Sequence, residues 1–191
     1  MSRLKTFAAV VLAATVPAMA QAADFNLTGG SGTTSTATFS SGGIGLNVTA
    51  WTDDGQESVT FSSGGLGVST GFFDAPGVGN NEALRLTFSQ AVNLSSLKVA
   101  EWDFTDRATL SWAGGSVNLA GAALDLNVLG TDTLNLSNVV GTVFKLQGTA
   151  LVSTFRLNGL TAVAAVPEPS TYALMGLGLL GIAAVRRRRA R

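Results

Sequence analysis

Carboxylate side chains gather at two points of the chain where they could bind a hard cation. Asp53 and Asp54 stand in an Asp-Asp-Gly segment, and Asp103 and Asp106 flank Phe104-Thr105. A calcium ion takes about six to eight oxygen ligands from carboxylates and loop carbonyls. These four aspartates are therefore the candidate calcium ligands. The full EF-hand spacing is absent, and Asp with Gly is also the ordinary composition of a solvated turn, which remains the alternative. No other cofactor is predicted.

Two residue types that carry much enzyme chemistry are missing. The 191 residues include no Cys and no His. A disulfide, a thiolate nucleophile, a Ser-His-Asp triad and an ordinary zinc site are therefore excluded.

A pair of carboxylates could still serve a glycosidase, which needs two of them about 5 to 10 Å apart. Glu57, Glu82, Glu101 and the aspartates supply the groups, but nothing in the sequence selects a pair. Only 13% of the residues are charged, and no cluster of polar residues predicts a catalytic pocket. We therefore predict that the protein is not an enzyme and name no catalytic residue. Glu82 and Glu101 are expected to face water on sheet surfaces.

Three tryptophans, Trp51, Trp102 and Trp112, could form an aromatic platform for sugar rings. Each could equally anchor the core, which is the commoner fate of a Trp in a strand. We expect at least two of them in the core, and exposure decides between the two interpretations.

The segments that must position these residues have the pattern of strands. Apolar residues alternate with polar ones in several runs of four to six residues, separated by Gly, Asn, Asp and Ser: 83–88, 96–99, 133–137, 143–146 and 154–157. Such alternation is typical of an antiparallel sheet with one face on the core and the other exposed to solvent. About ten short strands over residues 23–165 predict an all-β domain, an antiparallel β-sandwich that is jelly-roll-like or immunoglobulin-like. A barrel is the alternative.

One short segment recurs within the predicted domain. Residues 39–46 read FSSGGIGL, and residues 61–68 read FSSGGLGV. Two copies are too few for a solenoid, which needs at least about three. We interpret them as duplicated hairpins whose glycines supply positive φ; a repeated ligand loop is the alternative.

The N-terminus has the three regions of a secretory signal peptide in their usual order. Arg3 and Lys5 precede an apolar run over residues 7–16, and small residues at every second position follow Pro17. This predicts export by the Sec machinery as an N-terminal signal helix over residues 1–22. Signal peptidase is expected to cut between Ala22 and Ala23, with a cut after Ala20 as the alternative.

The C-terminus combines an uncharged apolar run with a cluster of arginines. Residues 172–185 carry no charge, and Arg186, Arg187, Arg188 and Arg189 follow directly. Fourteen helical residues rise about 21 Å, against a hydrocarbon core of about 30 Å. Snorkelling arginines and local thinning shorten the gap, so a single transmembrane helix is predicted. Positive charge stays cytoplasmic, which places the domain outside the inner membrane.

Residues 166–171 read VPEPST directly before this helix. Pro167 and Pro169 each lack a backbone donor and bias the residues before them to extended geometry, so this segment cannot join a helix or a central strand. Motif, Gly/Leu-rich helix and basic stop together resemble a PEP-CTERM sorting signal over 166–191. The resemblance implies that Pro167, Glu168 and Pro169 are the motif recognised by an exosortase, a membrane-embedded cysteine peptidase of Gram-negative bacteria.

These observations predict an inner-membrane-anchored precursor that is processed and delivered to the cell surface or extracellular matrix. The resemblance further implies a link to exopolysaccharide and biofilm, and we expect a structural or adhesive role there. A carbohydrate-binding module of the same matrix, dependent on calcium, is the alternative. Residues 23–165 hold 11 acidic and 5 basic residues, a formal charge of −6. Such a domain repels phosphate backbones, so no nucleic-acid partner is predicted.

Overall fold

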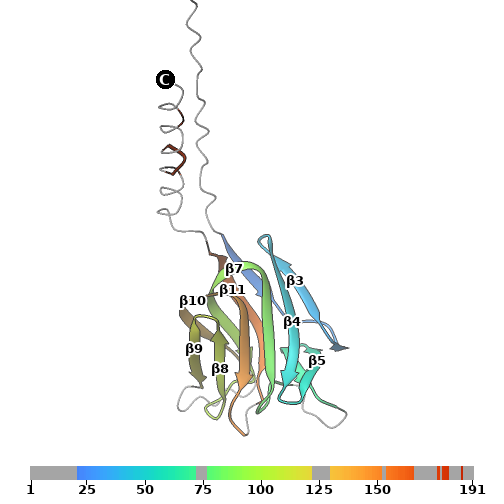
Figure 1. The fold of residues 1–191 in the computed structure, drawn as a ribbon. Helices are drawn as coiled ribbons and strands as arrows, with labels where there is room; N and C mark the ends of the chain where they lie inside the picture. Colours follow the sequence, from blue (N-terminus) through green and yellow to red (C-terminus); the bar gives the residue numbers. More distant parts are fainter. Residues whose placement is uncertain are drawn as a thin grey trace, which may run out of the picture.

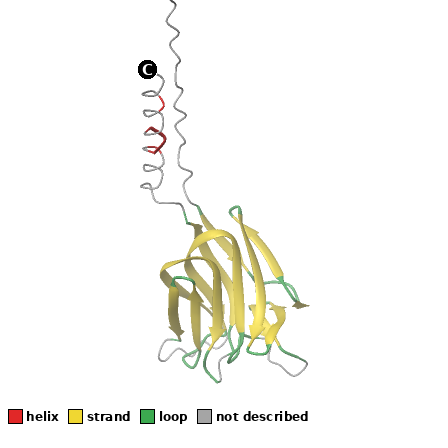
Figure 2. Ribbon diagram, viewed as in Figure 1, coloured by secondary structure: helices red, strands yellow, loops and turns green. Residues whose placement is uncertain are grey.

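The computed structural model describes residues 21–71, 77–121, 130–151 and 154–165, together with Gly176, Gly178–Leu180 and Arg186. Strands dominate these ranges, as Figures 1 and 2 show, so the all-β prediction is confirmed. The strands are β1 Ala22–Asn26, β2 Gly32–Thr34, β3 Ala37–Ser41, β4 Ile44–Thr52, β5 Gly55–Ser62, β6 Gly65–Ser69, β7 Ala83–Ala100, β8 Arg107–Trp112, β9 Gly115–Ala120, β10 Thr131–Gly148 and β11 Arg156–Ala164.

Alternating side chains explain why these segments are strands. On β4 the buried residues Ile44, Leu46, Val48 and Ala50 occupy every second position. Successive side chains of a strand point to opposite faces, so one face of β4 packs into the core while the other meets water. β8 has the same pattern, with Ala108 and Leu110 buried, and so do most of the strands that the alternation had predicted.

The described strands form one hydrogen-bonded sheet that closes on itself. β11 pairs with β6, and the order continues through β5, β4 and β7 until β7 pairs with β11 again. Five strands thus form a closed ring, a small barrel. β10, β8 and β9 continue the sheet from β7, β1 lies on β11, and β2 and β3 add to β5 and β4. The described strands therefore do not clearly form the predicted sandwich. A small barrel with additional strands, the alternative, fits them better.

Two long strands produce this arrangement. β7 and β10 each have 18 residues, and their antiparallel pairing shifts register between Asn135 and Val139 and between Gly141 and Val143. Asn138, at the first irregularity, has φ of 57°. Bulges bend a strand and increase its twist, so a single strand can pass from one side of the core to the other. The runs at 83–88 and 96–99 are halves of β7, and those at 133–137 and 143–146 are parts of β10.

Both copies of the repeated segment form hairpins, but their turns differ. β3 turns into β4 through Gly42 and Gly43, with Ser41 opposite Ile44, whereas β5 turns into β6 one residue earlier in the repeat, with Ser62 opposite Gly65. Gly42 and Gly43 have positive φ, and the corresponding turn residues Ser63 and Gly64 do not. The hairpins that we predicted are present, but their geometry is not duplicated. Gly65 lies where β6 approaches β11: it has φ of 123°, and an added Cβ would clash with the carbonyl oxygen of Leu157 on β11.

Aromatic rings link the layers of the core. Phe88 makes edge-to-face contacts with Phe25 and Phe144, with ring centroids 5.9 and 5.7 Å apart. Pairs of this geometry stabilise by about 0.5–1.5 kcal/mol beyond their buried area. One aromatic row therefore connects β1, β7 and β10.

The two ends of the domain leave it side by side. Ala22 at the start of β1 is paired with Val163 near the end of β11. The N–H of Ala165 donates to the carbonyl of Ala91 at 2.9 Å, so hydrogen bonding continues to the residue before Val166. The predicted signal-cleavage position and the start of the sorting segment therefore adjoin the same end of the domain (Figure 1).

Candidate functional site

The sorting segment lies mostly outside the described residues. Pro167, Glu168, Pro169 and Arg187–Arg189 are among those not described, while Gly176, Gly178–Leu180 and Arg186 are helical and exposed. Leu179 and Leu180 are 62% and 65% exposed, so neither packs into the β domain. In the part of the chain that the structure describes, no helix combines the length and apolarity needed to cross a membrane.

The predicted signal-cleavage position lies at the first residues of β1. Ala22 is exposed, whereas Ala23 is buried and an added Cβ on Gly42 would stand 3.1 Å from the Ala23 Cβ. A cut between Ala22 and Ala23 leaves this buried side chain in the mature protein, as does a cut after Ala20. Residues 1–20 are outside the described ranges.

The four candidate calcium ligands fall into separate places with separate roles. Asp53 and Asp54 are exposed at the β4–β5 turn, where they line a hollow of about 400 Å³ with Glu57 and Glu82. No group of three or more His, Cys, Asp or Glu residues suited to a metal ion occurs among the described residues. The calcium site therefore stays a prediction that this geometry does not support.

Asp103 and Asp106 organise the loop between β7 and β8. Asp106 is 2% exposed, and its two carboxylate oxygens accept the N–H groups of Asp103 at 2.6 Å and Thr154 at 3.2 Å. Asp103 Oδ1 accepts both the N–H and the hydroxyl of Thr105, at 2.7 and 2.6 Å. These bonds from Thr105 lower the pKa of Asp103 below its ordinary value of 3.8. The carboxylates thus hold two loops together.

The glutamates that could have formed a catalytic pair are also engaged. The prediction that Glu82 faces water is wrong: it is 9% exposed, and its Oε2 accepts the Gly79 N–H at 2.6 Å. Glu101 directly follows β7, has φ of 59° and pairs through its Oε1 with Arg156 Nε at 3.0 Å. Each stabilises a turn or a strand end.

The three tryptophans separate into core and surface. Trp102 is 1% exposed and stacks edge-to-face on Phe155 with centroids 5.0 Å apart. Trp112, at the end of β8, is partly buried against the core. Trp51 is half-buried on β4, on the opposite face from Ala50, and its Nε1 donates to Thr49 Oγ1 at 2.9 Å.

Trp51 and Trp112 line one open groove of about 600 Å³. Trp51 is on the outer face of the sheet together with Arg85 and Lys145. Trp112 is the register partner of the buried Phe144, so it is on the core face of β8 and meets the groove only at the end of that strand. Four neighbouring strands form it: β4, β7, β10 and β8. We call it the Trp51–Trp112 groove. Its lining residues are Trp51, Thr52, Arg85, Ser111, Trp112, Ala113, Thr142, Val143 and Lys145. The tryptophans had been proposed from the sequence, but their joint presence in one groove was not.

The base of this groove carries two cations that the sequence did not single out. Arg85 on β7 is the direct cross-strand partner of Lys145 on β10, and both are exposed. Of the five basic residues in 23–165, Arg156 is paired with Glu101, and Arg107 donates to the carbonyls of Phe104 and Asp106. Neither Arg85 nor Lys145 has an ion pair among the described residues. The sequence does show one basic residue on each of two alternating runs, Arg85 in 83–88 and Lys145 in 143–146. It does not show the strand register that places these two residues opposite each other.

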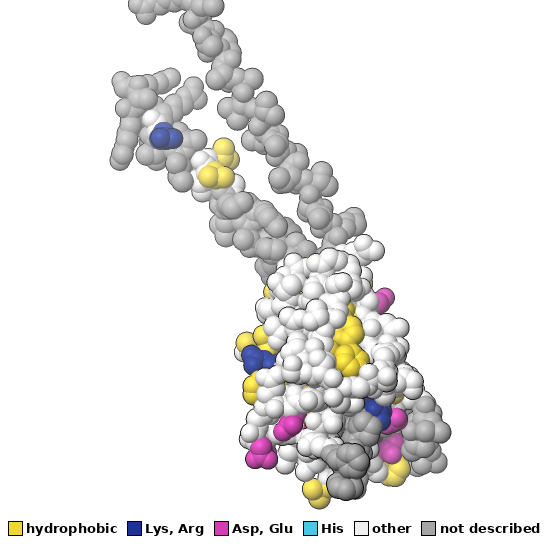
Figure 3. Space-filling model, turned by 90° about the vertical axis from the view of Figure 1, so that its right-hand side faces the viewer, with side chains coloured by type: hydrophobic (Ala, Val, Ile, Leu, Met, Phe, Trp, Pro, Cys, Tyr) yellow, Lys and Arg dark blue, Asp and Glu magenta, His cyan; other side chains and the backbone are white. Residues whose placement is uncertain are grey.

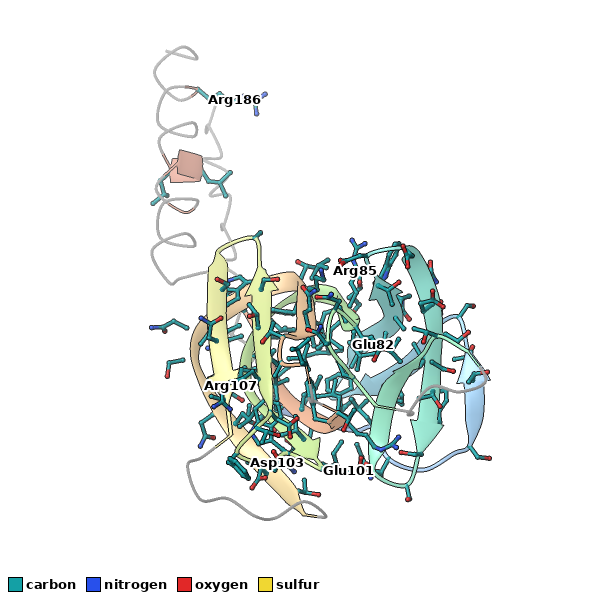
Figure 4. The ribbon with its side chains drawn as sticks, turned by 90° about the horizontal axis from the view of Figure 1, so that it is seen from below. Glu82, Arg85, Glu101, Asp103, Arg107 and Arg186 are labelled. Atoms are coloured by element: carbon teal, nitrogen blue, oxygen red, sulfur yellow. The ribbon has the colours of Figure 1, made fainter. Side chains whose placement is uncertain are left out.

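The acidic side chains nearest to the groove are those of the hollow that it adjoins at Thr52. In the view of Figure 4, Arg85 lies on the side of the domain away from Glu101 and Asp103. Figure 3 shows one face of the molecule, on which a few charged side chains are scattered among backbone and uncharged side chains. Two adjacent cations without an acidic partner are therefore exceptional in this domain, whose formal charge is −6.

The comparisons with known proteins bear on the C-terminal segment. The family model described as the PEP-CTERM protein-sorting motif matches residues 165–189. No curated protein matches the chain. The match begins at Ala165, whose N–H donates to the carbonyl of Ala91 in the β domain. A PEP-CTERM motif indicates an exported protein whose processing partner is an exosortase, and this chain carries that motif at residues 165–189.

Proposed function

We propose that the protein is a non-enzymatic component of the extracellular polymer matrix, with a structural or adhesive role at the cell surface. The observation that carries the proposal is the sorting motif at 165–189, placed directly after a compact β domain. The motif directs export and processing, and the domain is what would be delivered.

The assignment of carboxylates to structural roles supports a non-enzymatic domain. Glu82, Glu101, Asp103 and Asp106 are each committed to a backbone group or to an arginine. A general acid or base must reach its substrate within hydrogen-bond distance. Carboxylates that are engaged in hydrogen bonds or ion pairs within the domain stabilise its loops and strand ends instead.

The route is tested by the intact mass of the exported protein from cells with and without their exosortase. We expect a C-terminus near Pro167 in the first case and a retained tail in the second. A mature surface form that still carries residues 170–191 would contradict the processing step. Fractionation of the matrix tests the role: the protein should sediment with the polymer and release when the polymer is degraded.

The second candidate is a carbohydrate-binding module of the same matrix. The observation that favours it is the Trp51–Trp112 groove, which presents aromatic and hydrogen-bonding side chains on one surface. Binding pockets combine apolar and aromatic walls with a few polar groups that fix orientation. Calcium dependence belongs to this candidate, and glycan binding with and without a chelator tests it.

A further inference from the structure

We propose that the Trp51–Trp112 groove binds an acidic oligosaccharide, with a sugar ring against the Trp51 indole and hexuronate carboxylates on Arg85 and Lys145. The proposal rests on the carbohydrate-binding candidate and adds the charge class of the ligand and the residues that select it.

The aromatic wall is held in position before any ligand arrives. The Trp51 indole is anchored by its hydrogen bond to Thr49 Oγ1. The Trp112 indole lies along the β8–β9 turn, where an added Cβ on Gly114 would stand 2.7 Å from its Nε1. Large rigid aromatic side chains supply contact area at a low entropic cost. Their faces match the C–H-lined face of a pyranose ring.

The cations point to a negative charge on the ligand. Arg85 and Lys145 are directly opposite on neighbouring strands, and like charges at such positions destabilise a sheet. No acidic side chain among the described residues pairs with either one. A carboxylate between them would relieve the repulsion, and a guanidinium can bind it through two parallel hydrogen bonds.

The same cross-strand row supplies neutral hydrogen-bonding groups. Thr49, Arg85, Lys145 and Ser111 are successive register partners on β4, β7, β10 and β8. Hydroxyls beside the two cations suit the hydroxyl groups of a sugar. The groove volume of about 600 Å³ falls in the range of small-ligand sites, about 300–1,000 Å³, and its open shape admits part of a longer polymer.

Neighbouring acidic side chains restrict where the charge of the ligand can lie. Thr52 lines both the groove and the acidic hollow that contains Asp53, Asp54 and Glu57. The anionic groups of the ligand should therefore contact Arg85 and Lys145 and avoid the Thr52 side of the groove. A hexuronate polymer and a single-stranded nucleic acid both carry one charge per unit, so the choice between them rests on the hydroxyl groups of Thr52, Ser111 and Thr142, which suit sugar hydroxyls, and we favour the hexuronate polymer.

The test uses the full chain in detergent micelles and four probes of matched length: hexagalacturonate, its carboxyl methyl ester, maltohexaose and hexathymidylate. Calorimetry gives the affinities, and tryptophan fluorescence reports the groove. We expect hexagalacturonate to bind at least about tenfold more tightly than its ester or maltohexaose, because a charge-assisted contact is lost in each neutral probe.

Matched variants locate the binding. Arg85→Gln, Lys145→Gln and Trp51→Ala should each weaken hexagalacturonate binding by about tenfold or more. Lys98→Gln is the control, because Lys98 is an exposed lysine on β7 whose register partners are Thr133 and Gly159, away from the groove. All variants keep the C-terminal arginines, so attraction of the probe to that cluster is the same in each. Circular dichroism confirms that each variant folds.

Several results would overturn the proposal. They are no binding of hexagalacturonate, equal binding of its ester, equal losses in Lys98→Gln and Lys145→Gln, or tighter binding of hexathymidylate. Binding of maltohexaose as tight as that of hexagalacturonate would leave a neutral-sugar module and reject the acidic ligand. Processing of the exported protein is measured separately, so a failure here does not touch the sorting route.

Discussion

The β7–β8 loop and the Trp51–Trp112 groove both hold charged side chains, but the partners of those charges differ. In the loop, Asp106 accepts two backbone N–H groups and Asp103 accepts two bonds from Thr105. In the groove, Arg85 and Lys145 face each other across two strands without an acidic partner among the described residues.

The difference teaches how to separate structural charges from available ones. A buried polar group must find partners within the fold, because its desolvation is costly. An exposed cation beside another cation gains nothing from the fold and costs some stability. Loss of a loop carboxylate should therefore damage the fold, whereas loss of a groove cation should damage only binding.

The largest expected effect is from Asp106→Ala. This change leaves the N–H groups of Asp103 and Thr154 without their carboxylate, and bonds to charged groups contribute about 1.5–3 kcal/mol each. We expect the free energy of unfolding of the chain, measured in urea, to fall by about 3 kcal/mol. Asp54→Ala, at an exposed turn position, is the control and should change it by less than about 0.5 kcal/mol. Equal effects of the two changes would remove the structural role assigned to Asp106.

A smaller effect is expected from Asp103→Ala, because this side chain is half-exposed. It loses two hydrogen bonds from Thr105, for a cost of about 1 kcal/mol at neutral pH. The Thr105→Ala variant loses one of the same bonds and should show part of the effect. A cost that exceeds that of Asp106→Ala would reverse the order that burial predicts.

The Asp103 bonds also predict a pH dependence. The folded-state pKa of Asp103 is lowered, so its contribution is present above the ordinary pKa of 3.8 and is lost as pH falls through the lowered value. We expect the stability difference between wild type and Asp103→Asn to shrink below about pH 4. Urea unfolding between neutral and strongly acidic pH measures it, and a difference independent of pH would contradict this assignment.

The smallest expected effect on stability is from Lys145→Glu, and its sign is opposite. The substitution replaces a like-charge pair with an Arg–Glu pair across β7 and β10, which should stabilise by about 0.2–1 kcal/mol. The same variant should lose binding of hexagalacturonate. Clear destabilisation would show that Lys145 serves the fold, and the contrast between groove and loop would disappear.

Much of the general architecture was accessible from local pattern. Alternation located the strands because burial of one face imposes a period of two. Alternation could not show that the runs at 83–88 and 96–99 belong to one strand. The irregular pairing between them interrupts the alternation, so the two runs look like separate strands in the sequence. The closed ring depends on the pairing of β6 with β11, whose residues are far apart in the chain.

Some residues of the candidate site could be identified from the sequence, and others only from the structure. Trp51 and Trp112 were candidates from their residue type alone, whereas Arg85 and Lys145 became notable only when register placed them opposite each other. Asp53, Asp54, Asp103 and Asp106 were grouped by composition, and the fold assigns the last two to hydrogen bonds within a loop. Composition cannot distinguish an aspartate that binds a metal ion from one that accepts backbone hydrogen bonds, because both roles use the same carboxylate oxygens.

The order of residues along the chain was sufficient for the sorting segment, since two prolines, an apolar run and a basic stop act through local chemistry. The closed ring, the buried state of Trp102 and the groove that brings Trp51 to the pair of cations Arg85 and Lys145 required tertiary structure. They arise from contacts between strands distant in sequence, and only the register of those strands decides which side chains meet.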